Sequence, residues 1–113
     1  MTQISTHILD LSLGQPAPNV PLRVERQYAG HWRLLASART DRDGRCSRLL
    51  PEEEGLSAGV YRLSFDTAAY FAARDLESLY PVVEITFQVR DGEQHFHLPL
   101  LLSPYGFSTY RGS

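Results

Sequence analysis

Apolar and polar residues alternate along most of the chain with a period of two. Five such runs, each with one apolar face, begin near Val20, His31, Gly59, Pro81 and Gly92. In the second run, the expected apolar face holds Trp32, Leu34, Ala36 and Ala38. Strands with one apolar face bury it by packing sheet against sheet. The pattern therefore predicts an all-β fold, a sandwich of two antiparallel β-sheets.

One segment and several turns interrupt this alternation. Residues 67–79 are rich in alanine and poor in β-branched residues, and Asp66 or Thr67 can cap a helix, which predicts a single short α-helix. The pairs Ala29-Gly30 and Asp43-Gly44 are typical of turns, because glycine takes positive φ readily. Asp91-Gly92 predicts a hairpin turn between two strong strands.

The composition is that of a globular protein. The chain has 113 residues, 42% hydrophobic and 21% charged, which predicts a single domain over residues 1–113 and argues against disorder. A net charge of −2 gives no support to nucleic-acid binding, and no apolar run approaches the length of a membrane span. The chain has no lysine, which excludes Schiff-base chemistry. The polar sequence after Met1 shows no secretory leader and predicts a cytoplasmic protein.

Histidine is the main candidate for chemistry near neutral pH. His95 and His97 lie two residues apart on a predicted strand, so both side chains project from the face opposite Phe96. Pro99 and Leu101 continue the same face. A face that mixes imidazoles with apolar residues is typical of the wall of a cleft or of an interface.

The other candidate groups carry weaker signals. His7 lies on the first predicted strand, and His31 follows a glycine turn and is expected at the surface. Cys46 is the only cysteine, which rules out an internal disulfide, and its position in a predicted strand favours a structural role over a nucleophile. The sequence has neither a Gly-x-Ser-x-Gly elbow nor a glycine-rich phosphate loop.

The sequence ends in Tyr110-Arg111-Gly112-Ser113 without a disorder-prone spacer. A frayed tail is common at chain ends. This composition is instead compatible with a docked terminus, whose hydroxyls, guanidinium and carboxylate would be placed in a site. Little apolar area is at stake there, so the segment is expected to serve function more than stability.

Several motifs along the chain resemble a known family. They are Thr6-His7-Ile8-Leu9-Asp10, Gly14-x-Pro16-Ala17, Thr40-Asp41-x-Asp43-Gly44-Arg45, Tyr61-Arg62-Leu63, Asp66-Thr67 with Tyr70-Phe71, and His95-Phe96-His97 through Tyr110-Arg111-Gly112-Ser113. Together they resemble the transthyretin-related 5-hydroxyisourate hydrolases of urate degradation over essentially the whole chain. The terminal Tyr-Arg-Gly-Ser is similar to these enzymes and unlike true transthyretins. Phe96 replaces a common tyrosine on the core face, away from the chemistry.

This resemblance implies a transthyretin-like sandwich of eight strands with one short α-helix. It also implies a homotetramer, a dimer of dimers, with active sites in the channel between the dimers. The implied reaction is hydrolytic opening of the six-membered ring of 5-hydroxyisourate at its C6–N1 amide bond. The implied product is 2-oxo-4-hydroxy-4-carboxy-5-ureidoimidazoline, and no cofactor is implied.

The same resemblance assigns roles to individual residues. It implies catalytic roles for His7, Arg45, His97 and Ser113, and substrate binding by His7, Arg45, Tyr110 and Arg111. A neutral imidazole can deprotonate water and return the proton to a leaving nitrogen. The arginine fork matches the carbonyls and nitrogens of a flat oxidised purine and can hold oxyanion charge. Whether His7 or His97 is the base stays open.

Two other functions stay open on the sequence alone. The same sandwich could carry a small ligand without turnover, as transthyretin does. A metal-assisted hydrolase could use His7, His95 and His97, since a His-x-His pair with a third histidine is a minimal zinc pattern. No cysteine or carboxylate stands at a supporting spacing.

Overall fold

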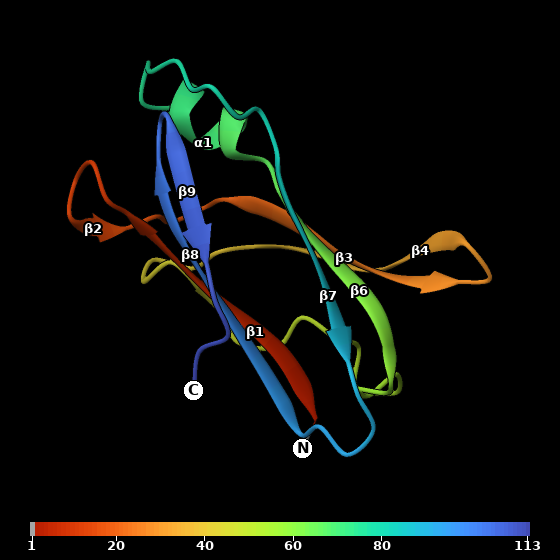
Figure 1. Cartoon of the computed structure of the whole chain (residues 1–113). Coiled ribbons are helices and arrows are strands. Elements are labelled where there is room, and N and C mark those ends of the chain that lie inside the picture. The colour runs from red at the N-terminus through yellow and green to blue at the C-terminus, as the bar shows by residue number, and fades with distance from the viewer. Residues whose placement is uncertain (1) are drawn as a thin grey trace.

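The computed structural model, which describes residues 2–113, is a sandwich of two β-sheets with a short helix at one end (Figure 1). One sheet has the order β2-β1-β8-β9, with β5 also paired to β1, and the other has the order β4-β3-β6-β7. The elements are β1 (Gln3–Asp10), β2 (Gln15–Pro16), β3 (Pro21–Tyr28), β4 (His31–Arg39), β5 (Arg45–Cys46), β6 (Gly59–Phe65), α1 (Thr67–Ala72), β7 (Val83–Val89), β8 (His95–Ser103) and β9 (Gly106–Thr109).

The core lies between the two sheets and confirms the predicted sandwich. It is built by inward side chains that recur every second residue, such as Ile4 and Ile8 of β1, Leu22 and Val24 of β3, and Leu63 and Phe65 of β6. The first sheet also contributes Phe96, Leu98 and Leu100 of β8. Residues 2–113 form nine strands where eight were implied, and two of the nine, β2 and β5, are two-residue pairings against β1. None of the helices within residues 2–113 is long and apolar enough to cross a membrane.

The strand pairing differs from the sequence predictions in two places. The strands β1 and β8 pair in parallel, from Gln3 opposite His95 to Asp10 opposite Leu102, so the first sheet is not purely antiparallel. The Asp91-Gly92 turn does not close a hairpin, since it joins β7 in one sheet to β8 in the other. Gly92 has the expected positive φ of 85°, but turn chemistry alone does not place the two strands in the same sheet.

The predicted apolar face of β4 is wrong at Trp32 and Leu34, neither of which packs against the core. The pairing of β3 with β4 shifts between Val24 and Glu25, so that Leu35 is an extra residue on β4. Such a bulge reverses the alternation beyond it. As a result, Leu35 packs against the core while Leu34, expected on the apolar face, is 53% exposed.

The helix is shorter than the predicted 67–79. The Asp66 side chain accepts a hydrogen bond from the Ala69 N–H at 3.0 Å, which confirms the predicted N-cap. The helix ends early because Asp75 takes a positive φ of 59°. The Leu76 N–H then donates to the Phe71 carbonyl, an arrangement that satisfies the last carbonyls of a helix.

Asp10, at the end of β1, ties the first sheet to the helix. Its buried carboxylate accepts hydrogen bonds from the Tyr70 hydroxyl at 2.6 Å and from Arg74 Nη1 at 2.5 Å. Burial by itself raises the pKa of Asp10, but the hydrogen bonds from Ser12 and Tyr70 and the charge of Arg74 outweigh it, and the pKa lies below its ordinary value. The charged carboxylate therefore anchors β1, the strand that carries His7.

Candidate active site

The outer face of the first sheet carries three of the four histidines, His7, His95 and His97. Because β1 and β8 are parallel and in register, Ser5 lies opposite His97 and His7 lies opposite Pro99. Residues paired in this way project on the same side of a sheet. The alternation that buries Phe96 thus places His95 and His97 on the outer face, beside Ser5 and His7 of β1.

The strand β5 brings Arg45 to the same face. Arg45 is paired with His7 across the short β1–β5 ladder. Asp41 shapes the turn before it, since Asp41 Oδ1 accepts from the backbone N–H of Asp43 and of Arg45, each at 2.9 Å. Gly44 has a positive φ of 75°, and a Cβ there would stand 2.5 Å from the Ile8 carbonyl oxygen. The tight turn against β1 therefore requires glycine at this position.

A cleft of about 180 Å³ opens on this face. It is lined by Ser5, Thr6, Arg45, Ser47, His95, His97 and Ser113. The structure therefore brings together three of the four predicted catalytic residues. The fourth, His7, adjoins Arg45 in the ladder. Its Nε2 lies 3.0 Å from the Asp43 carbonyl oxygen, which can only accept, so Nε2 carries the proton when the ring is neutral.

His97 is held from two sides. Its Nδ1 lies 2.8 Å from Ser5 Oγ, and its backbone carbonyl accepts a hydrogen bond from the Gly112 N–H at 2.7 Å. Burial is the largest cause that lowers the pKa of His97 below its ordinary value, and the nearby charges of Arg45, His7 and His95 lower it further. The ring is therefore neutral at pH 7 and can accept a proton.

Arg45 is the cation of the cleft. It takes no part in the ion pairs found within residues 2–113. Its guanidinium therefore keeps its donors for a ligand. A planar fork of this kind suits carbonyl oxygens and developing negative charge.

The C-terminal segment is docked, but not all of it faces the cleft. Gly112 forms an antiparallel bridge with His97, which places Ser113 at the cleft. Arg111 turns elsewhere: its Nη2 lies 2.7 Å from Glu93 Oε2, and its guanidinium stacks over the Phe96 ring. Tyr110 is 56% exposed and is not part of the cleft lining. Substrate binding by Tyr110 and Arg111 stays a prediction.

Sequence reasoning missed two serines of the cleft, Ser5 and Ser47. Ser5 precedes His7 by two residues on the same strand, so the alternation alone could have placed it on the histidine face. Ser47 follows β5 outside any regular strand, and no periodic signal marks it.

The described residues do not form the three-histidine metal site. Within residues 2–113, no group of three or more His, Cys, Asp or Glu side chains is arranged to hold a metal ion.

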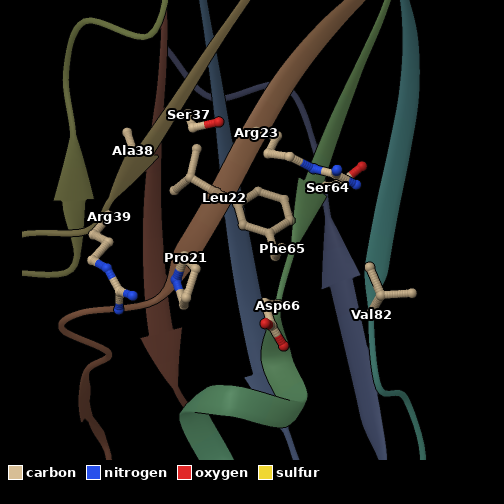
Figure 2. A pocket seen from close by; sticks show the side chains of 10 residues that line it. All are labelled: Pro21, Leu22, Arg23, Ser37, Ala38, Arg39, Ser64, Phe65, Asp66 and Val82. Carbon is tan, nitrogen blue, oxygen red and sulfur yellow. The ribbon is translucent and has the colours of Figure 1, made fainter. Parts of the chain in front are cut away.

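A larger hollow of about 810 Å³ lies on the second sheet, where Arg23, Ser64 and Arg39 are among its lining residues (Figure 2). It contains none of the predicted site residues.

Comparison with known proteins agrees with this geometry. Residues 4–112 match the HIUase/Transthyretin family. The chain is 47% identical over 117 residues to the 5-hydroxyisourate hydrolase of Caulobacter vibrioides, with 100% of both chains covered. It is 42% identical to the Klebsiella pneumoniae 5-hydroxyisourate hydrolase. The two structures superpose over 100% of each chain with a TM-score of 0.87.

The structure is equally similar to a transthyretin. Sea bream transthyretin, solved in complex with thyroxine, is 36% identical and matches 96% of this chain and 93% of its own with a TM-score of 0.90. Both kinds of relative thus share the sandwich and the course of the backbone. The chain belongs to the HIUase/Transthyretin family.

Proposed function

We propose that this chain is a 5-hydroxyisourate hydrolase, which opens the six-membered ring at the C6–N1 amide bond. The observation that carries the proposal is the cleft in which Arg45, His97 and Ser113 meet next to His7. A neutral imidazole can serve as a general base in the hydrolysis of a cyclic amide, and a cation that takes no part in the ion pairs within residues 2–113 can stabilise the oxyanion. The relatives named for this activity match the whole chain.

In the proposed reaction, His97 acts as the general base. It accepts a proton from a water molecule while the water oxygen attacks C6. The tetrahedral intermediate then collapses, the C6–N1 bond breaks, and the imidazolium returns its proton to N1. The water thereby supplies the hydroxyl of the new carboxyl group and the hydrogen of the released nitrogen. General acid–base catalysis of this type contributes roughly 10²–10⁴ in rate.

Arg45 stabilises the charge that develops on the C6 oxygen. The loss of one well-aimed donor to such an oxyanion typically costs about 3–4 kcal/mol in the barrier. Arg45 also keeps His97 neutral, because its positive charge disfavours the imidazolium. Ser113 lines the same cleft and is placed to hydrogen-bond the flat substrate.

The competing function within the family is ligand carriage without turnover. The fold does not separate the two, since the TM-scores to the hydrolase and to the thyroxine-bound transthyretin are 0.87 and 0.90. The lining of the cleft favours turnover, because it contains two imidazoles and a guanidinium. An apolar carrier channel would have aliphatic groups at these positions.

We further propose that the chain forms a homotetramer, a dimer of dimers. The strands β7 and β9 each form one edge of their sheet and present unpaired backbone groups. Exposed aromatic side chains, Tyr105 and Phe107, lie at the β9 edge. Light scattering at micromolar concentration tests the assembly, and a monomer mass would contradict it.

The decisive assay generates 5-hydroxyisourate in place from urate with urate oxidase. Its ultraviolet decay is followed with and without this protein, after the urate has been consumed. We expect the decay to accelerate in proportion to the protein concentration. An unchanged decay, together with saturable binding of the substrate or of thyroxine, would instead identify a carrier.

A further inference from the structure

The Ser5 hydroxyl lies between two imidazole rings. Its Oγ is 2.9 Å from His95 Nε2 and 2.8 Å from His97 Nδ1. Ser5 is only 6% exposed, and the parallel register of β1 and β8 fixes it between the two rings. The hydroxyl is therefore a fixed link between a solvent-exposed histidine and the proposed base.

The number of hydrogens allows only two arrangements of this link. Burial, Arg45, His7 and His95 all lower the pKa of His97, so its neutral ring carries one N–H. A serine hydroxyl has one hydrogen and two lone pairs. If both rings donated to it, its buried hydrogen would lack an acceptor, because the two nitrogens are the only hydrogen-bond partners of Ser5 Oγ found within residues 2–113. The hydroxyl therefore donates to one nitrogen and accepts from the other. Either Ser5 donates to His95 and accepts from His97 Nδ1, or it donates to His97 Nδ1 and accepts from His95.

The two arrangements have opposite consequences for catalysis. In the first, His97 carries its proton on Nδ1, and Nε2 has a lone pair for the proton of water. In the second, Nε2 carries the proton and His97 cannot act as a base at that atom. Only the first also fits the imidazolium that forms during the reaction, since Nδ1–H then keeps its acceptor. A base held in the wrong tautomer loses most of its effect.

We propose that Ser5, with His95 as its acceptor, is a positioning residue that holds His97 as the Nδ1–H tautomer and leaves Nε2 ready to accept a proton. This inference rests on the proposed function, because it takes His97 as the base. In this proposal, His95 acts on His97 through the Ser5 hydroxyl rather than by binding the substrate.

The test removes each partner of the hydroxyl in turn. In His95→Leu, the Ser5 hydroxyl has lost its acceptor and donates to His97 Nδ1, which forces the wrong tautomer. We expect kcat to fall by about 10²-fold, at the lower end of what general-base catalysis supplies. In Ser5→Ala the tautomer is no longer forced, and we expect a smaller loss of about 10-fold in kcat.

The double variant gives the result that a merely structural role would not give. Ser5→Ala combined with His95→Leu lacks the misdirecting hydroxyl, so its kcat should recover from the His95→Leu level to that of Ser5→Ala. Ser5→Thr, which retains the hydroxyl, should keep most of the activity, and His31→Leu serves as the surface control. A double variant less active than either single variant would overturn the proposal.

A second readout does not depend on turnover. At pH 8, the ¹⁵N chemical shifts of His97 distinguish a protonated Nδ1 from a protonated Nε2. We expect Nδ1–H in the unaltered protein and Nε2–H in His95→Leu. Nε2–H in the unaltered protein would refute this inference, whereas a chain with the expected shifts and no hydrolysis would refute only the proposed function.

Discussion

Gly112 lies directly against the imidazole of His97. Its N–H donates to the His97 carbonyl oxygen at 2.7 Å, and a Cβ built on Gly112 would stand 2.7 Å from the ring carbon Cδ2. The same Cβ would approach the Pro99 ring at 3.2 Å. The absence of a side chain at Gly112 thus lets the C-terminal segment close one side of the cleft without displacing the proposed base.

We predict that Gly112→Ala lowers kcat/KM while the protein stays folded. The added methyl group displaces the His97 ring from its position, because it would contact Cδ2 on the side of the ring opposite Ser5, and a displacement of about 1 Å at a catalytic group can cost about 10²-fold in rate. The matched control is Gly106→Ala, whose Cβ would meet only Ser103 Oγ at 3.8 Å. Equal activity of the two variants in the urate-coupled assay would show that Gly112 does not position His97.

The activity should depend on the protonation of His97. Because its pKa is lowered from the ordinary 6.5, the ring stays neutral to lower pH, and kcat/KM should decline only below pH 6.5. Arg45→Gln removes one of the charges that lower this pKa. The acid limb of the profile should therefore move to higher pH, in addition to any loss of rate. An acid limb that stays in place would contradict the electrostatic coupling of Arg45 to His97.

Asp10→Asn should destabilise the fold by about 3 kcal/mol. Breaking a buried ion pair typically costs about 3–5 kcal/mol. We expect the lower value because Arg74 retains some contact with water. The folded pKa of Asp10 lies below 3.8, so its contribution to the free energy of unfolding is present above that pH and is lost as the pH falls through the folded pKa. The free energies of unfolding of the two proteins, measured with urea, should therefore differ at pH 7 and differ less at pH 3.

Deletion of residues 110–113 should remove most of the activity and leave the sandwich folded. Tyr110 and Arg111 are exposed, and the segment contacts the sheet through the Gly112 bridge to His97 and through the Arg111 guanidinium over the Phe96 ring. The deletion removes Ser113 from the cleft and opens it beside His97. Thermal melts are compared with kcat/KM of the same protein. Near-native turnover would refute the role of this segment, and failure to fold would make it structural.

Local patterns predicted much of this structure. The alternation around Phe96 placed His95 and His97 on the outer face, and Asp66 was identified as a helix cap. Side-chain periodicity reports which face of a strand is buried, and this face determines where the candidate site lies. The assignment of His7 and Arg45 to one site came from the resemblance to a family, because these residues lie far apart in the sequence.

Pairing between distant strands could not be predicted in this way. The alternation of β1 is the same whether β8 runs parallel or antiparallel to it, yet only the parallel register places Ser5 between two histidines. The bulge at Leu35 likewise depends on the partner strand. The roles of Ser5 and Gly112 arise from these long-range contacts, and a single sequence carries no local signal for them.

The most direct test of the proposed site compares two histidine variants on 5-hydroxyisourate generated from urate. His97 lines the cleft, whereas His31 is exposed at the start of β4 in the other sheet. We predict that His97→Asn loses at least about 10²-fold in kcat/KM, as expected for a general base, while His31→Asn retains the rate of the unaltered protein. Equal activity of the two variants, or equal losses with both proteins folded, would contradict the assignment of the chemistry to this cleft.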